Sequence, residues 1–282
     1  MQFGKVKTIV ARTARNREKI TMKTKRNTLI ILLLIFLSGI FACVKHRNPD
    51  RQGGEVCDLF LLIGQSNMAG RGTMQPADTI AMEGVRLLDS EGQPVPASNP
   101  LNRYSSIRKR LDLQQIGPGY GFARKLHAVT GHKILLVVNA RGGSSLQEWM
   151  PGGSYFAEAV RRTREAMRFA RLRAVLWHQG ESNSSQPAGY LTDLNVLVDS
   201  LRRALHSPGL PFIAGEIAPW HKNAARFNPR IRSISDTIAN SGWVSSAGCT
   251  PLIDDKDPHF DRSGQLLLGE RYADKVLEMC YE

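Results

Sequence analysis

The segment at residues 58–70, DLFLLIGQSNMAG, constrains the fold more than any other part of the chain. Its apolar run has the length of a β-strand and ends abruptly in a turn of small residues that contains Ser66. A strand that is covered on both faces of a parallel sheet is apolar at every position. Ligands of such sheets bind just beyond the carboxyl ends of the strands. Ser66 is therefore a candidate nucleophile, although a serine at this place can also cap a helix.

An acidic loop near the C-terminus contains a candidate base for this serine. His259 lies in the sequence DDKDPHFD, immediately before an apolar pattern of helical spacing. A serine hydroxyl becomes an effective nucleophile when an imidazole accepts its proton and a carboxylate orients the imidazole. The loop offers both groups, and the alternative is a solvated or capping histidine.

Two further apolar runs end in polar turns of the same kind. ILLVVNA is followed by RGGSS, and AVLW is followed by HQGES. Glycine lets backbone amides approach a ligand closely, and several fixed donors can stabilise a developing oxyanion. The candidate donors are the N–H groups of Ser66 and Gly143 and the side-chain amide of Gln179, although such turns can merely close a strand-to-helix connection. His178 competes with His259 as the base.

Other polar and aromatic residues of these turns are candidates for substrate contacts. We assign Gln65, Trp149 and Glu181 to substrate binding. An indole face suits the apolar side of a sugar ring, and ordinary packing is the alternative for Trp149. The alternative for Glu181 is a pairing with Arg141 that braces two turns.

The four turns together resemble the sequence blocks of the SGNH (GDSL-like) hydrolases. The closer resemblance is to the sialate O-acetylesterase-like and carbohydrate esterase family 6 branch, over roughly residue 58 to the C-terminus. Its first block, Gly-Gln-Ser-Asn-Met, corresponds to residues 64–68 here, and its third, Trp-His-Gln-Gly-Glu, to residues 177–181. The resemblance implies that Ser66 is the nucleophile and His259 the base, with a glycine and an amide in the oxyanion hole.

The chain departs from this family at the carboxylate of the triad. Members usually carry it three residues before the histidine, where this sequence has Lys256. Pro258 favours an extended conformation of the preceding residue, so the loop can turn differently. We therefore predict Asp257 as the third member, with Asp255 as the alternative. A backbone carbonyl could also orient the imidazole.

The strand and helix patterns predict an α/β protein. Helical periodicity occurs between the apolar runs, and such alternation is typical of a three-layer α/β/α sandwich with a central parallel sheet. The resemblance implies the flavodoxin-like SGNH hydrolase fold. Strands are predicted near residues 57–63, 85–89, 134–139, 174–178, 211–216 and 243–246. The composition, 42% hydrophobic and 22% charged, is typical of a globular protein, and we expect one esterase domain over residues 56–282.

The N-terminal part of the chain predicts secretion. Within residues 1–43, Lys23, Lys25 and Arg26 lie directly before the apolar run 29–37, which continues to a small residue before Cys43. This order is typical of a signal sequence, and the cysteine suggests a lipid anchor. Ordinary cleavage and an uncleaved anchor are the alternatives. Met22 is a possible true start, and residues 44–55 are predicted to be a flexible tether.

The net charge of +13 does not indicate nucleic-acid binding. Residues 1–42 hold nine of the 38 basic residues and one of the 25 acidic residues, which leaves about +5 for the rest. No aromatic and basic motif for base stacking accompanies this charge. No spacing of His, Cys or Asp suggests a zinc site, and we expect neither metal nor cofactor.

These observations predict a secreted serine esterase that removes acetyl groups from glycans such as xylan or sialic acid. Its expected location is the periplasm or the outer membrane of a bacterial envelope, attached through a lipid anchor. One alternative is a catalytically silent glycan-binding protein of the envelope, favoured by Lys256 at the usual acid position. The other is an esterase or thioesterase for lipid acyl chains.

Overall fold

The computed structural model describes residues 57–281. The predicted signal segment, the possible start at Met22, Cys43 and the predicted tether at residues 44–55 lie outside the described residues. Among the described residues, no helix is both long enough and apolar enough to cross a lipid bilayer.

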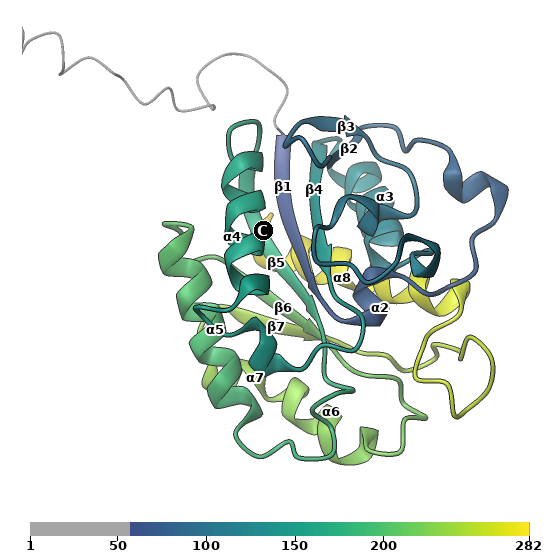
Figure 1. Cartoon of the computed structure of the whole chain (residues 1–282), viewed down its shortest axis with the longest axis vertical. Coiled ribbons are helices and arrows are strands. Elements are labelled where there is room, and N and C mark those ends of the chain that lie inside the picture. The colour runs from purple at the N-terminus through teal and green to yellow at the C-terminus, as the bar shows by residue number, and fades with distance from the viewer. Residues whose placement is uncertain (1–56, 282) are drawn as a thin grey trace, which may run out of the picture. The chain divides into compact units, whose positions relative to one another are not determined.

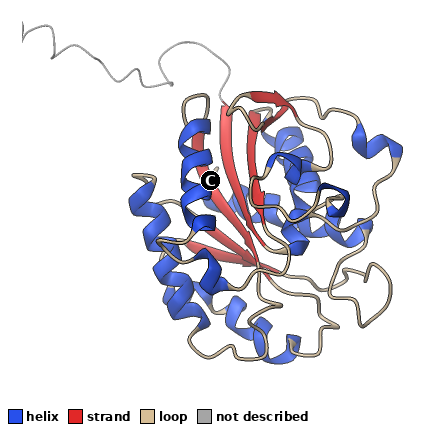
Figure 2. Ribbon diagram, in the orientation of Figure 1, coloured by secondary structure: helices blue, strands red, loops and turns tan. Residues whose placement is uncertain are grey.

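A seven-stranded sheet forms the centre of the domain (Figures 1 and 2). Its strand order is β3-β2-β4-β1-β5-β6-β7, and all neighbours are parallel except β2 and β3. The six predicted strands are confirmed, and the short antiparallel edge strand β3 was not predicted. The strands are β1 (Cys57–Gly64), β2 (Val85–Leu88), β3 (Pro94–Pro96), β4 (Lys133–Ala140), β5 (Arg171–His178), β6 (Phe212–Gly215) and β7 (Ser241–Val244).

Helices cover both faces of this sheet, as Figure 1 shows. Helices α3 and α8 pack together on one face, and α4, α5, α6 and α7 lie on the other. The predicted three-layer α/β/α sandwich is therefore confirmed. The helices are α2 (Ser66–Ala69), α3 (Pro118–Thr130), α4 (Ser154–Ala166), α5 (Tyr190–Ala204), α6 (Ala224–Arg232), α7 (Ile234–Thr237) and α8 (Arg262–Cys280). Short 3₁₀ helices occupy Pro76–Thr79, Leu101–Tyr104, Leu111–Leu113 and Leu146–Trp149.

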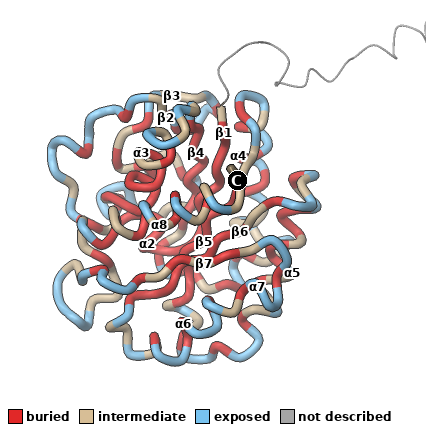
Figure 3. Tube along the Cα trace, turned by 180° about the vertical axis from the view of Figure 1, so that it is seen from behind, coloured by how far each residue is buried: buried red, intermediate tan, exposed pale blue. Residues whose placement is uncertain are grey.

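The alternation of side chains along β1 explains why its sequence is apolar throughout. Leu59, Leu61 and Ile63 pack under α4 and α5, whereas Phe60 and Leu62 pack under α3 and α8. All five are almost completely buried, and Figure 3 shows the strands as the buried centre of the domain. A strand with a core on each side has no solvent-facing position, which confirms the interpretation of this run.

The topology puts the turn after β1 at a place where ligands are expected. If β2 and β3 are set aside, the five parallel strands run β4-β1-β5-β6-β7, which is the flavodoxin-like order 2-1-3-4-5. The chain leaves β1 and β5 toward opposite neighbours in the sheet, and a crevice forms outside the carboxyl ends of such strands. Ser66 follows β1, and the Gln179 turn follows β5.

Candidate active site

The close approach of β1 and β5 fixes the turn that carries Ser66. Gly64 has φ +139°, and a Cβ atom there would lie 2.2 Å from the carbonyl oxygen of His178. Only glycine fits this position. The next residue, Gln65, donates its backbone N–H to the same carbonyl at 2.9 Å. The chain then turns immediately into α2, so that Ser66 projects at the end of the sheet.

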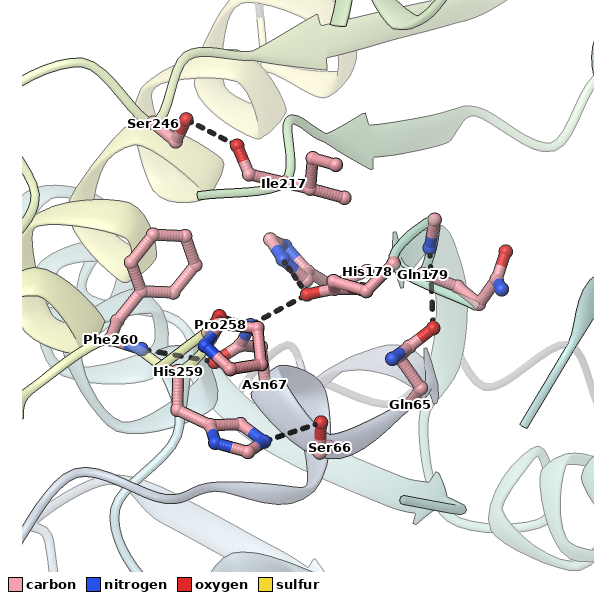
Figure 4. Close-up of polar contacts among 12 residues, drawn as sticks. Gln65, Ser66, Asn67, His178, Gln179, Ile217, Ser246, Pro258, His259 and Phe260 are labelled. Carbon is pink, nitrogen blue, oxygen red and sulfur yellow. Dashed lines mark hydrogen bonds and ion pairs between the residues drawn. The ribbon is translucent and has the colours of Figure 1, made fainter. Parts of the chain in front are cut away.

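Ser66, His259 and Asp257 form a continuous hydrogen-bonded chain. The Oγ atom of Ser66 lies 2.9 Å from Nε2 of His259 (Figure 4). On the other side of the ring, Nδ1 lies 2.7 Å from Oδ1 of Asp257. The same carboxylate oxygen accepts the backbone N–H of His259 at 3.0 Å, which fixes the loop. Of the two candidate carboxylates, Asp257 contacts the imidazole, whereas Asp255 is exposed.

The surroundings of His259 favour a neutral imidazole. Burial lowers its pKa below the usual value, and the Arg71 guanidinium lowers it further. The Asp257 carboxylate opposes both effects. A neutral ring that donates Nδ1–H to Asp257 presents an unprotonated Nε2 to the serine hydroxyl, as a general base requires.

Asn67 joins the serine turn to the histidine loop. Its Nδ2 donates to the Pro258 carbonyl at 3.0 Å, and its Oδ1 accepts the Phe260 N–H at 3.2 Å (Figure 4). These two partners flank His259. Oδ1 also accepts Nε2 of Gln265 at 3.3 Å. A single buried amide, adjacent to the nucleophile, therefore holds the base from both sides along the chain.

Glu181 completes this network from β5. Its Oε1 accepts the remaining Asn67 proton at 2.7 Å, and its Oε2 is buried without a hydrogen-bond partner among the described residues. Burial raises the pKa of Glu181 to about 7. The side chain lines the pocket in front of Ser66, as expected for a substrate contact. Arg141 does not pair with it but donates to the Ile107 carbonyl.

His178 is not placed to act on Ser66. It is completely buried, and burial lowers its pKa to about 3. Its Nδ1 lies 3.4 Å from the Tyr272 hydroxyl, and its Nε2 has no hydrogen-bond partner among the described residues. The rival base is therefore excluded by position.

Of the three candidate oxyanion donors, the structure leaves two available. Gly143 lines the pocket with Ser66, and in residues 57–281 neither of their N–H groups donates to another protein group. Gln179 corrects our prediction. Its side chain is fully buried, and its amide donates to the Ser144 carbonyl at 3.2 Å and to Oδ1 of Asn183 at 2.7 Å. Its donors are occupied, so Gln179 braces two turns.

Of the other two predicted substrate contacts, Gln65 lies at the pocket and Trp149 does not. Gln65 lines the pocket, and its Oε1 accepts the N–H groups of Gly180 and Ser182, each at 3.4 Å. Trp149 corrects our prediction, because its side chain is fully buried. It packs edge-on against Trp177 and donates Nε1–H to Oγ of Ser144 at 2.9 Å. Its indole face is part of the core and does not reach the pocket.

The pocket in front of Ser66 has a volume of about 390 Å³ and carries two cations. Arg71 and Lys109 both line it, and neither forms an ion pair with a carboxylate of residues 57–281. Arg71 instead donates to the carbonyls of Gly70 and Leu113, at 2.7 and 2.9 Å. Residues 57–281 contain no group of three or more His, Cys, Asp or Glu side chains that could hold a metal ion.

The sequence motifs did not indicate that Asn67, Arg71 and Lys109 belong to the site. Asn67 stood inside the conspicuous Gly-Gln-Ser-Asn-Met block and could have been singled out as a buried polar neighbour of the nucleophile. Arg71 and Lys109 come from irregular segments, where no periodicity indicates which way a side chain points. The pocket cations could therefore be found only from the folded chain.

Comparisons with known proteins agree with this geometry. The sequence model of the family described as carbohydrate esterase, sialic acid-specific acetylesterase, matches residues 56–278. A probable carbohydrate esterase of Arabidopsis thaliana is 30% identical over 242 residues, which cover 78% of this chain and 90% of the relative.

Solved structures show the same fold. An X-ray structure of a protein from Arabidopsis thaliana has a TM-score of 0.69 at 26% identity, covering 79% of this chain and 99% of that one. A carbohydrate acetylesterase from Xanthomonas citri has a TM-score of 0.58 at 18% identity, covering 79% of this chain and 57% of that one. The sequence match extends over most of the domain and includes every residue of the Ser66 site. This chain is an esterase and belongs to the carbohydrate esterase, sialic acid-specific acetylesterase family.

Proposed function

We propose that the protein hydrolyses acetyl esters of glycans, with Ser66 as the nucleophile. The observation that carries this proposal is the hydrogen-bonded chain from Ser66 through His259 to Asp257. The Oγ atom attacks the acetyl carbonyl carbon while Nε2 of His259 accepts the hydroxyl proton. The imidazolium that forms is stabilised by Asp257.

The oxyanion of the tetrahedral intermediate is held by the N–H groups of Ser66 and Gly143. Both residues line the pocket, and neither N–H group has another acceptor in the described part of the chain. His259 then protonates the departing sugar oxygen, and the bond from the acetyl carbon to that oxygen breaks. A water activated by the same imidazole attacks the acetyl-serine and releases acetate, which restores Ser66.

The test is acetate release by the purified protein from a panel of acetylated xylan and O-acetylated sialic acids. We expect release from at least one glycan, and complete loss in Ser66→Ala with an unchanged circular dichroism spectrum. Undiminished release by Ser66→Ala would remove the mechanism. Release from no acetylated carbohydrate, with retained hydrolysis of nitrophenyl acetate, would remove the assignment to glycans.

The same site bears on the two alternative functions. A silent glycan-binding protein was favoured by Lys256, but Asp257 contacts the imidazole in place of a carboxylate at that position. The second alternative is an esterase for lipid acyl chains. The rates of hydrolysis of acetyl and octanoyl esters distinguish it from a glycan acetylesterase. We expect the acetyl ester to be the better substrate, because charged side chains line the pocket.

We also propose that the enzyme is secreted and lipid-anchored at Cys43 as a periplasmic or outer-membrane lipoprotein. The support is the order of basic residues, apolar run and cysteine in residues 23–43. Metabolic labelling with a fatty acid tests this proposal. Label that is present in the wild type and lost in Cys43→Ser is expected, and an unlabelled wild type would contradict it.

A further inference from the structure

A second pocket, separate from the one at Ser66, is lined by four arginines. Arg103, Arg108, Arg161 and Arg162 converge on a cavity of about 370 Å³, which we call the arginine pocket. They come from two parts of the chain, the irregular segment after β3 and helix α4. Like charges gathered in one cavity repel each other, so such a cluster is unfavourable unless an anion binds there.

Two of these arginines have no carboxylate partner in residues 57–281. Arg103 donates to the backbone carbonyl and the hydroxyl of Ser98, and Arg108 donates to the Ser105 carbonyl at 2.7 Å. The Nε atoms of Arg103 and Arg108 are both buried without a hydrogen-bond partner. Each guanidinium is thus held in place by neutral groups and keeps an unused donor.

Arg162 is the most deeply buried of the four. It is 1% exposed, and its terminal nitrogens donate to the carbonyls of Leu88 and Asp89 at 2.8 and 3.1 Å. Its Nε also lacks a partner in the described part of the chain, and burial lowers its pKa. Arg162 is thus fixed by backbone carbonyls, and Glu158, Glu165 and Asp89 partly offset its charge.

Three carboxylates, Glu158, Glu165 and Asp89, act on the pocket, one fewer than its four arginines. Glu158 and Glu165 accept hydrogen bonds from Arg161 at 2.6 to 2.7 Å. Asp89, the other carboxylate that acts on Arg162, accepts the backbone N–H groups of its own turn. The pocket therefore keeps an excess of positive charge.

Residues of one chain segment, 108–113, line both the arginine pocket and the Ser66 pocket. Arg108 and Leu111 line the arginine pocket, whereas Lys109 and Leu113 line the Ser66 pocket. Positive charge thus continues over this segment to Arg71 at the nucleophile. A ligand that occupies both pockets must extend across the segment, which an oligosaccharide can do.

We propose that the arginine pocket binds a carboxylate of an acidic oligosaccharide whose acetyl ester lies at Ser66. The guanidinium group is planar and binds a carboxylate through two parallel hydrogen bonds. Arg103 and Arg108, which line the pocket and have no carboxylate partner in residues 57–281, supply such contacts from their terminal nitrogens. This inference rests on the proposed function and adds a second requirement for the substrate, a carboxylate elsewhere on the acetylated glycan.

The test compares acidic and neutral ligands with the full-length protein. Calorimetry measures binding of unacetylated oligomers of galacturonic acid and of sialic acid, and of a neutral xylo-oligomer of equal length. We expect at least one acidic oligomer to bind about 10-fold more tightly than the neutral one, with an affinity that falls as salt rises. Equal affinity for all three would overturn the proposal.

Variants assign the binding to the arginine pocket. Arg103→Gln and Arg108→Gln are each expected to weaken binding of the acidic oligomer about 10-fold, because each removes a charged hydrogen bond. Arg108→Lys keeps the charge and should retain part of the affinity. The matched control is Arg230→Gln, an exposed arginine on α6 that should leave binding unchanged. An unchanged affinity in both arginine-pocket variants would contradict the assignment.

Activity distinguishes this inference from the proposed function. All of these variants should hydrolyse nitrophenyl acetate at the wild-type rate, because none touches Ser66 or His259. Release of acetate from neutral glycans with no effect of the arginine substitutions would overturn only the inference. Release from no carbohydrate at all would overturn the proposed function, while binding of the unacetylated oligomers would still be measured independently.

Discussion

Nδ1 of His259 lies 2.7 Å from Oδ1 of Asp257, a carboxylate only two residues earlier in the chain. Pro258 between them turns the loop so that one carboxylate oxygen accepts both the ring N–H and the backbone N–H of His259. This short loop replaces the more usual spacing, in which the acid precedes the histidine by three residues.

Asp257→Asn should lower kcat/KM for an acetyl ester by about 10³-fold to 10⁴-fold, because an amide favours the wrong tautomer of the imidazole. The measurement is steady-state hydrolysis of nitrophenyl acetate. Asp255→Asn is the matched control, since Asp255 is exposed, and it should retain nearly full activity. A loss in the control that equals the loss in Asp257→Asn would reassign the triad.

Asn67→Ala should lower kcat by about 10-fold to 100-fold with little change in KM, because a small displacement of the base is costly. The residues flanking His259 would lose their link to the serine turn. Asn228→Ala is the control, since this buried amide holds the backbone of Ile217 in the same manner. The control should lose thermal stability but not kcat, and equal kcat losses in both would argue against a positioning role.

The pH dependence of kcat/KM should report the lowered pKa of His259. Activity requires the neutral imidazole, so it should rise with pH through a midpoint below about 6.5. Arg71→Gln removes a cation that lowers this pKa and should move the midpoint upward. Profiles of both proteins on a small neutral ester test this expectation, and a midpoint that moves downward in Arg71→Gln would refute it.

Glu181→Gln should change stability in a pH-dependent way. Burial raises the pKa of Glu181 from 4.5 to about 7, so the folded protein binds a proton that the unfolded chain releases between these values. The wild type therefore loses stability as pH rises through this window, at up to about 1.4 kcal/mol per pKa unit. The Tm of Glu181→Gln relative to the wild type should increase from pH 5 to pH 8. A difference that is independent of pH would contradict the buried carboxyl.

The sequence predicted the layers of the fold because β1 carries its information locally. An apolar residue at every position of 59–63 requires a core on each side, and both cores are present. The edge strand Pro94–Pro96 is short and contains two prolines, so its sequence carries no comparable signal. The helical segment after β6 is divided at Ser233 into α6 and α7, and periodicity alone does not indicate such a break.

Within the site, the sequence predicted the kind of residue better than its orientation. Ser66 and His259 follow from the chemistry that their turns offer, and the structure brings them together. Gln179 and Trp149 also follow strand ends, but their side chains turn inward and bond to the neighbouring turns. The orientation of a side chain depends on the residues that it contacts in the folded protein. A single sequence does not show which residues these are.

The geometry of the site predicts that the imidazole of His259 activates the hydroxyl of Ser66. Labelling with a fluorophosphonate, followed by mass spectrometry of the peptides, tests this claim directly. We expect one modified residue, Ser66, and a labelling rate at least about 10²-fold lower in His259→Ala. A wild-type protein that stays unlabelled, or equal labelling of both proteins, would contradict the account.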